Sequence, residues 1–191
     1  MAVHNDTRQQ ILEIAEELLQ KRGFNAFSYQ DIANELGIRK ASLHYHYASK
    51  ADLGLALAER HANRALGFLQ GIDEMHLSPW QQLDEFFKPF VDLAKTCQLM
   101  CPGGIMAAEF ETLPKPMQNR MCEYFTIIHT WLTRVLTQGR ASGQLYFGAE
   151  PAIKAYAIIA TLEGAILIAK TRQNADFIDP IVQDIKVSLG G

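Results

Sequence analysis

The sequence predicts an all-α protein built from about nine helices. Apolar residues recur at three- and four-residue spacing along most of the chain, which is the period of an amphipathic helix. No segment shows the strict alternation of a half-buried strand, and Gly, Pro and capping residues separate the periodic segments. With 191 residues, of which 48% are hydrophobic and 20% charged, the chain has the composition of an ordinary globular protein.

Capping signals place the individual helices along the chain. The first helix is predicted over residues 7–22, with Thr7 as its N-cap and Gly23 as its left-handed stop. The second is expected at residues 28–36, between a Ser28 cap and Gly37. The further helices are predicted at residues 40–46, about 50–71, 79–99, 105–110, 117–138, 151–170 and 180–189, with Pro102, Gly103 and Gly104 breaking the chain before the sixth.

Composition excludes several function classes. The N-terminal residues lack the apolar core of a signal peptide, and the best apolar run, residues 155–169, contains Glu163 and is too short for a membrane span. Three cysteines cannot build a disulfide framework and fit a reducing cytoplasm. The sequence contains no phosphate loop, nucleophile elbow or zinc motif, so we predict a cytoplasmic non-enzyme without cofactor, metal site or membrane contact.

The charge distribution separates the two parts of the chain. The net charge of −3 comes entirely from residues 65–191, because residues 1–64 carry equal numbers of basic and acidic side chains. Within this neutral part, residues 36–50 contain Arg39, Lys40, Lys50 and two histidines but no acid, with Tyr45 and Tyr47 interleaved. A basic segment that also carries aromatic residues is typical of contact with DNA phosphates and base edges.

The spacing in the same region indicates a helix-turn-helix. Ala33 is the small residue at which two helices can cross, Gly37 supplies the tight turn, and Ile38 and Leu43 are the apolar anchors that follow. This geometry leaves a second helix of about two turns, which can lie in the DNA major groove. The sequence therefore predicts a three-helix helix-turn-helix head on a larger helical body.

Residues 23–38 and 41–53 resemble the DNA-binding domain of TetR/AcrR-type transcriptional regulators, and the likeness extends over about residues 7–60. The resemblance implies a DNA-binding domain at residues 1–50, linked by the helix at about 50–71 to a ligand-binding and dimerisation domain at residues 51–191. It also implies a homodimer that represses transcription from a palindromic double-stranded DNA operator and is released by a small-molecule inducer. A helical enzyme and a protein–protein adaptor without DNA binding are the alternative functions.

Ten residues of the head are candidates for DNA contact. Two depart from the family pattern: Arg39 stands where Ser or Thr usually caps the recognition helix, and His44 where Tyr usually contacts a phosphate. Lys50 is expected to anchor a phosphate, whereas Leu43 and Tyr47 are expected to pack inside the head. The candidates are Ser28, Tyr29, Gln30, Arg39, Lys40, Ser42, His44, Tyr45, His46 and Lys50.

The helix predicted at residues 151–170 is apolar on every face, so it must be buried on more than one side. Small residues, among them Ala157, Ala160 and Gly164, allow another helix to approach closely. We therefore predict that this helix and the one at residues 117–138 form a four-helix bundle with their copies in a homodimer. A central helix within one subunit is the alternative.

The inducer site is predicted from apolar and polar residues in the body. Most apolar stripes are plain core, and polar groups among them are better pointers to a pocket because a buried charge needs a partner. The ligand-binding candidates are Phe87, Phe90, Met106, Glu109, Phe110, Tyr124, His129, Trp131 and Glu163.

Cys101 is a candidate sensor of oxidants or electrophiles. It directly precedes Pro102, and a thiol at such a break is expected to be more accessible than one in a core. The segment around it resembles that of N-ethylmaleimide-responsive repressors. A small, partly buried hydrophobic residue is the alternative interpretation.

Overall fold

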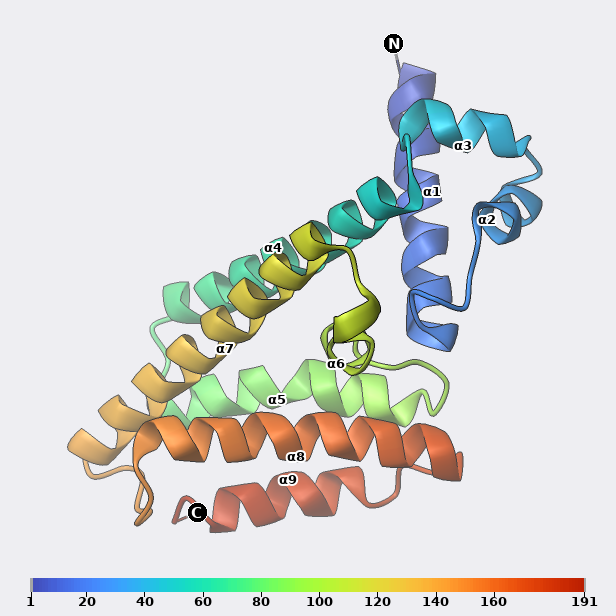
Figure 1. The fold of residues 1–191 in the computed structure, drawn as a ribbon. Helices are drawn as coiled ribbons and strands as arrows, with labels where there is room; N and C mark the ends of the chain where they lie inside the picture. The colour runs from blue at the N-terminus through green and yellow to red at the C-terminus, as the bar shows by residue number, and fades with distance from the viewer. Residues whose placement is uncertain (1, 191) are drawn as a thin grey trace. The chain divides into compact units, whose positions relative to one another are not determined.

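The computed structural model describes residues 2–190, which form nine α-helices and one short 3-10 helix and contain no strand (Figure 1). The fold class predicted from the sequence is confirmed. The elements are α1 (Ala2–Arg22), α2 (Tyr29–Leu36), α3 (Lys40–His46), α4 (Lys50–Glu74), α5 (Pro79–Lys95), α6 (Pro102–Ala108), η1 (Phe110–Thr112), α7 (Lys115–Ala141), α8 (Pro151–Arg172) and α9 (Ile178–Val187).

Several of the predicted helix ends are confirmed. Ser28 and Asp31 form a capping box at the start of α2, and Ser78 and Gln81 form another at the start of α5. The backbone turns left-handed at Gly23, with φ 92°, and at Gly37, with φ 65°. Both angles lie in the region where an L side chain is strained, which is why glycine ends α1 and α2.

Two local predictions are wrong. Residues 102–104 do not break the chain but open α6, because a proline is tolerated in the first turn of a helix, where no intrahelical donor is needed. Gly103 is required there for packing, since a Cβ at this position would collide with the ring of Tyr124. The N-cap expected at Thr7 is also absent, since α1 begins at Ala2 and continues through Thr7.

The chain folds into two compact units whose boundaries are not contiguous in sequence. Unit 1 contains residues 1–63 and 102–124, and unit 2 contains residues 64–101 and 125–191. Unit 1 therefore combines the N-terminal helices with α6, η1 and the first part of α7, a segment that the sequence analysis assigned to the body. The chain passes from one unit to the other within α4, between Cys101 and Pro102, and within α7.

The core of unit 1 is apolar. Residues of α1, α2 and α3 meet in it, and α1 also packs against α6. Its N-terminal part buries Ile11, Ala15, Leu19, Phe24, Phe27, Ile32 and Leu43, each no more than 4% exposed. Burial of these side chains removes apolar surface from water and holds α2 and α3, which are too short to be stable alone, against α1.

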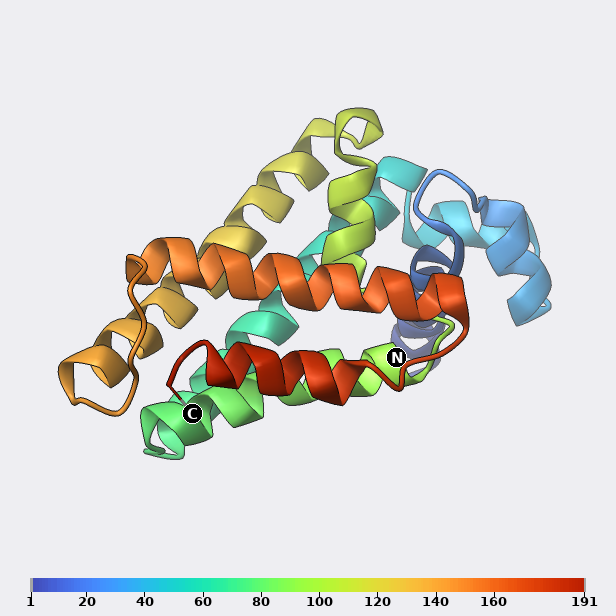
Figure 2. The same cartoon turned by 90° about the horizontal axis from the view of Figure 1, so that it is seen from below.

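In unit 2, α5, α8 and α9 lie side by side and contact one another (Figures 1 and 2). A cluster of buried residues that includes Ala94, Cys101 and Ile166 joins them, with Phe90 and Ile181 packed against it. Within the described chain, α8 alone is long and apolar enough to cross a membrane by length and composition. Its contacts with α5 and α9 bury one face of α8 in the core of unit 2.

Candidate nucleic-acid interface

The crossing of α2 and α3 has the geometry of a helix-turn-helix. Ala33, at the crossing, is 1% exposed, and Leu43 on α3 is fully buried. The turn between the helices is closed by the N–H of Ile38, which donates to the carbonyl of Ala33 at 3.1 Å. Leu43 and Tyr47 pack inside the head as expected, so the opposite side of α3 is free to face solvent.

The exposed surface of α3 and its N-terminus includes Ala41, His44 and four further residues, Arg39, Lys40, Ser42 and Tyr45, which are here called the reading surface. Arg39 makes no side-chain capping bond, which leaves its guanidinium outside the helix. Tyr45 is 76% exposed, an unusual position for a large aromatic side chain in a single chain, and its ring meets the half-buried ring of His46 edge-on. Two cations, a hydroxyl and an aromatic ring are the groups that contact phosphates and base edges.

The structure corrects the assignment of Tyr29 to DNA contact. Tyr29 is 5% exposed, and its hydroxyl donates to the carbonyl oxygen of Tyr47 at 2.9 Å. Burial, reinforced by the negative charge of Asp52, raises the pKa of Tyr29 to about 12. Tyr29 therefore holds the end of α3 against α2 from inside the head.

His44 packs against Tyr29 in the head. The ring of His44 lies 4.9 Å from the Tyr29 ring, centroid to centroid, and its Nδ1 donates to the Ala48 carbonyl oxygen at 3.1 Å. The residue is exposed, and these two contacts orient its ring.

Ser28 and Gln30 are exposed at the start of α2, but both side chains make local hydrogen bonds. Ser28 is occupied by the capping box with Asp31, whose pKa is lowered by the hydrogen bonds from Ser28. Gln30 Nε2 donates to Asn34 Oδ1 at 2.8 Å. The backbone N–H and the hydroxyl of Ser28 both donate to Asp31, whereas Gln30 keeps a second side-chain N–H for a phosphate at the helix N-terminus.

The ammonium of Lys50 lies at the start of α4 in a pocket of aromatic rings. Its Nζ donates to the carbonyl oxygen of Phe27 and lies 4.7 Å from the ring centroids of both Phe24 and Phe27. Partial burial lowers the pKa of Lys50, and the negative charges of Glu109 and Asp31 oppose that shift. The side chain is thereby held in one position instead of moving freely in solvent.

Comparison with known proteins agrees with this geometry. Residues 11–57 match the family model of bacterial regulatory proteins of the tetR family, and residues 79–185 match the model of the tetracyclin repressor-like C-terminal domain. The chain belongs to the TetR family. It is a helix-turn-helix transcriptional regulator, and this family consists of DNA-binding regulators and not of enzymes.

The chain is similar to other TetR-family members over nearly its whole length. A TetR regulator from Legionella pneumophila is 34% identical, with 96% of this chain and 97% of that chain covered and a TM-score of 0.85. An uncharacterized HTH-type regulator of the lacX 3' region of Lactococcus lactis subsp. lactis is 28% identical over 99% of this chain and 97% of its own length. The HTH-type repressor DhaR of a Mycobacterium species is 22% identical over 90% and 86%. The reduced form of Escherichia coli NemR, 22% identical over 96% and 97%, shares the fold with a TM-score of 0.80.

The residues that the sequence analysis assigned to the inducer of this TetR regulator are divided between the two units. Met106, Glu109, Phe110 and Tyr124 belong to unit 1, and Phe87, Phe90, His129, Trp131 and Glu163 belong to unit 2. Several of their polar groups are already bonded within a unit. Trp131 Nε1 donates to Asp73 Oδ1 at 2.9 Å, and His129 Nε2 donates to the Ala152 carbonyl oxygen at 3.0 Å.

Glu109 is hydrogen-bonded to the turn between α1 and α2, a contact that its position in the sequence did not indicate. Its carboxylate accepts the backbone N–H of Phe24 at 2.6 Å, in the turn between α1 and α2. These residues are 85 positions apart, so no local spacing reveals the contact. The carboxylate thereby binds a turn of the DNA-binding head within unit 1.

In unit 2, the predicted ligand residue Glu163 is half-buried. Burial raises the pKa of its carboxyl group, and a hydrogen bond from the Cys101 thiol partly opposes the shift. Its Oε1 finds no hydrogen-bond partner within residues 2–190. Cys101 lies in the loop between α5 and α6 but is only 6% exposed, so the expectation that its thiol is accessible is wrong: the residue packs with Ala94 and Ile166.

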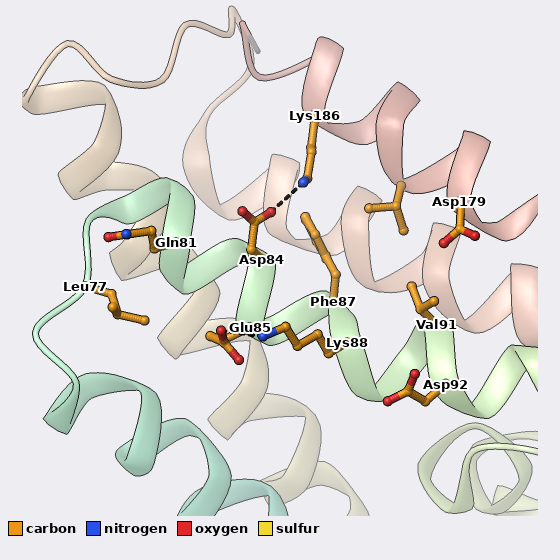
Figure 3. A pocket seen from close by; sticks show the side chains of 11 residues that line it. Leu77, Gln81, Asp84, Glu85, Phe87, Lys88, Val91, Asp92, Asp179 and Lys186 are labelled. Carbon is orange, nitrogen blue, oxygen red and sulfur yellow. Dashed lines mark hydrogen bonds and ion pairs between the residues drawn. The ribbon is translucent and has the colours of Figure 1, made fainter.

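An open groove of about 520 Å³ lies on unit 2 between α5 and α9 (Figure 3). Phe87 is the one predicted ligand residue in its lining. Acidic and basic side chains surround the rings and methyl groups, and Lys186 reaches across to Asp84. The groove is lined by Leu77, Gln81, Asp84, Glu85, Phe87, Lys88, Val91, Asp92, Asp179, Val182 and Lys186.

Proposed function

We propose that this TetR regulator is a cytoplasmic homodimeric repressor that binds a palindromic operator and is released by a small-molecule inducer. The observation that carries the proposal is the reading surface: cations and an exposed tyrosine on a helix whose opposite side is locked into a helix-turn-helix. Relatives named as repressors, DhaR among them, support repression. Two heads on one dimer would read half-sites about 34–36 Å apart.

Lys50 supports the DNA-binding part of the proposal. An ammonium group has three N–H donors, and the Phe27 carbonyl occupies one of them. Two donors remain for a phosphate oxygen, on a side chain whose position is already fixed by the Phe24 and Phe27 rings. The N-terminus of α4 adds its own attraction for a phosphate.

The outward face of α8 supports a dimer. Ile153, Tyr156, Leu167 and Ile168 are 62%, 58%, 48% and 49% exposed in the single chain. They recur at helical spacing and are separated by the small exposed residues Ala157, Ala160 and Thr161. An apolar stripe with small residues allows a second helix to pack closely, so we propose a bundle of α7 and α8 with their copies.

DNA binding is tested by affinity measurements across a salt series, using duplexes enriched by the wild-type protein from a random-sequence library. Lys50→Ala should weaken binding to all sequences and flatten the slope of log affinity against log salt by about one unit, because one phosphate contact is lost. Lys95→Ala, in unit 2, is the matched control and should leave the slope unchanged. Arg39→Ala should change which sequences are preferred. A dimer that enriches no duplex would instead be an adaptor.

Dimerisation is tested by the molar mass in solution. Ile168→Glu places a charge in the proposed interface and should convert the dimer to monomers. Val187→Glu is the control: Val187 is 57% exposed on α9, outside the proposed interface, and this variant should remain dimeric. A monomeric wild-type protein, or an Ile168→Glu variant as dimeric as the control, would contradict the proposal.

We further propose that the inducer class includes electrophiles and oxidants that react with Cys101. The thiol is 6% exposed and donates a hydrogen bond to the Glu163 carboxylate, so an adduct on its sulfur would break that bond and displace the residues packed around it. The reaction therefore requires local opening of the loop between α5 and α6. N-ethylmaleimide is the probe. Cys101→Ser should stay on DNA in its presence, whereas Cys122→Ser, which removes an exposed cysteine, should be released like the wild type. Release of Cys101→Ser would exclude Cys101 as the sensor.

A further inference from the structure

The segment that follows α6 is hydrogen-bonded to the turn between α1 and α2. Glu109, directly after α6, accepts the N–H of Phe24 through Oε2 at 2.6 Å and the N–H of Asn25 at 3.3 Å through Oε1. Asn25 Nδ2 donates to Thr112 Oγ1 at 2.7 Å, and that hydroxyl donates back to the Glu109 carbonyl oxygen at 2.7 Å. A charged acceptor on two backbone donors is the stronger kind of hydrogen bond.

The turn is shaped to receive this carboxylate. Gly23, at its start, has φ 92°, and a Cβ added there would lie 2.5 Å from Glu109 Oε1. Glycine therefore both allows the backbone conformation and leaves room for the carboxylate. α1 and α6 also pack against each other, so the hydrogen bonds belong to a larger contact within unit 1.

The same contact leads to the candidate phosphate anchor. The Phe24 residue whose N–H is bound by Glu109 also places its ring 4.7 Å from Lys50 Nζ. Glu109 is in addition close enough to Lys50 to raise its pKa against the effect of burial. Glu109 therefore contacts Phe24, and Phe24 contacts the Lys50 ammonium, so a change at Glu109 can alter the position of that ammonium.

α6 is also where the chain enters unit 1 from unit 2. Cys101 is the last residue of the unit 2 segment, and Pro102 begins both α6 and the unit 1 segment that contains Glu109. One helix of seven residues therefore separates Glu109 from the end of the unit 2 segment.

We propose that Glu109 is a positioning residue that ties α6 and η1 to the α1–α2 turn and holds Lys50 and the reading surface in their DNA-binding arrangement. Loss of this tie lowers operator affinity. The inference rests on the proposed function, since it requires that the head binds DNA.

The test uses the full-length variants Glu109→Gln and Glu111→Gln. Each variant removes one negative charge, and the two positions are only two residues apart. Glu111 is exposed, so its variant changes the electrostatic repulsion of DNA to the same extent as Glu109→Gln does. Affinity and its salt dependence are measured on the duplex that the wild type enriches from a random library. Amide hydrogen exchange of residues 24 and 25 reports the tie directly in the absence of DNA.

Glu109→Gln should bind the duplex about tenfold more weakly than Glu111→Gln, which corresponds to one lost charged hydrogen bond. For Glu109→Gln, the slope of log affinity against log salt should become flatter by about one unit. The double variant Glu109→Gln/Lys50→Ala should have the same slope as Glu109→Gln, because the same phosphate contact is already lost. A merely destabilised protein keeps its slope. The amides of Phe24 and Asn25 should exchange faster in Glu109→Gln alone.

Three outcomes overturn the ideas separately. If no duplex is enriched, the proposed function fails, while amide exchange still decides whether Glu109 holds the turn. If the duplex is bound by Glu109→Gln and Glu111→Gln with equal affinity and slope, Glu109 does not position the DNA-binding residues. If exchange at residues 24 and 25 is unchanged, the tie itself is refuted.

Discussion

Replacing Gly23 by alanine perturbs two features of the α1–α2 turn at once. The φ of 92° places an alanine in a strained backbone region, at a free-energy cost of about 1–2 kcal/mol. The new Cβ also lies 2.5 Å from Glu109 Oε1 and forces the carboxylate off its donors, which costs a further ~1.5–3 kcal/mol for hydrogen bonds to a charged group. We therefore expect Gly23→Ala to lower the free energy of unfolding by about 2.5–5 kcal/mol.

Gly37→Ala is the matched control because it isolates the backbone contribution. Gly37 has φ 65°, but nothing lies within 4 Å of an added Cβ, so only about 1–2 kcal/mol should be lost. Both variants are unfolded in urea and followed by far-UV circular dichroism at one protomer concentration, since dimer formation makes stability concentration-dependent. The excess loss in Gly23→Ala should disappear when both proteins also carry Glu109→Gln. Equal losses in the two single variants would refute the steric reasoning.

Three further predictions concern buried groups. Glu163→Gln should become more stable relative to the wild type as pH rises above the unfolded-state pKa of glutamate. Because the pKa of Glu163 is raised, the folded wild type binds a proton more tightly than the unfolded chain, and the stability that this proton contributes is lost as pH increases. If the difference in free energy of unfolding between the two proteins is constant with pH, the prediction is contradicted. Tyr29→Phe removes the hydrogen bond to Tyr47 and should lower the free energy of unfolding by about 1 kcal/mol near neutral pH. Between pH 10 and about 12 only the unfolded wild type ionises at Tyr29, which destabilises the wild type, so the difference in free energy of unfolding between the two proteins should become smaller. The same unfolding assay in alkaline buffers measures this difference. Leu43→Ala, at a fully buried position, should lower the free energy of unfolding by about 2–5 kcal/mol, and a loss below 1 kcal/mol would mean that the helix-turn-helix core is not packed as described.

Much of the fold was predictable because its signals are local. The capping boxes at Ser28 and Ser78 and the left-handed glycines at positions 23 and 37 act within a few residues, so residue type and spacing were enough. The same applies to the helix-turn-helix, where Ala33 and Leu43 must be small and apolar at fixed spacing. Local rules failed at residues 102–104, because a Pro-Gly-Gly run is read as a break unless the tertiary contact of Gly103 with Tyr124 is known.

The candidate site was predictable in part. Arg39, Lys40, Ser42 and Tyr45 are exposed on α3 and its N-cap, as the basic, aromatic segment and the expected packing of Leu43 and Tyr47 indicated. Tyr29 was misassigned because position at a helix start does not tell which way a side chain points, and its ring is buried under His44. Cys101 was misjudged for a similar reason, since its surroundings come from α5 and α8, distant in sequence.

The sequence by itself determined the helices, the helix-turn-helix and the basic, aromatic segment of residues 36–50, because each depends on residues within one or two helical turns of one another. Only the tertiary structure decided which polar groups remain available and which bind other parts of the chain. Glu109 illustrates the difference: nothing nearby in the sequence marks its carboxylate, and its partners are backbone N–H groups 84 and 85 residues away. Hydrogen bonds to backbone leave no signature in the partner's residue type, so such a contact emerges only when the chain has folded.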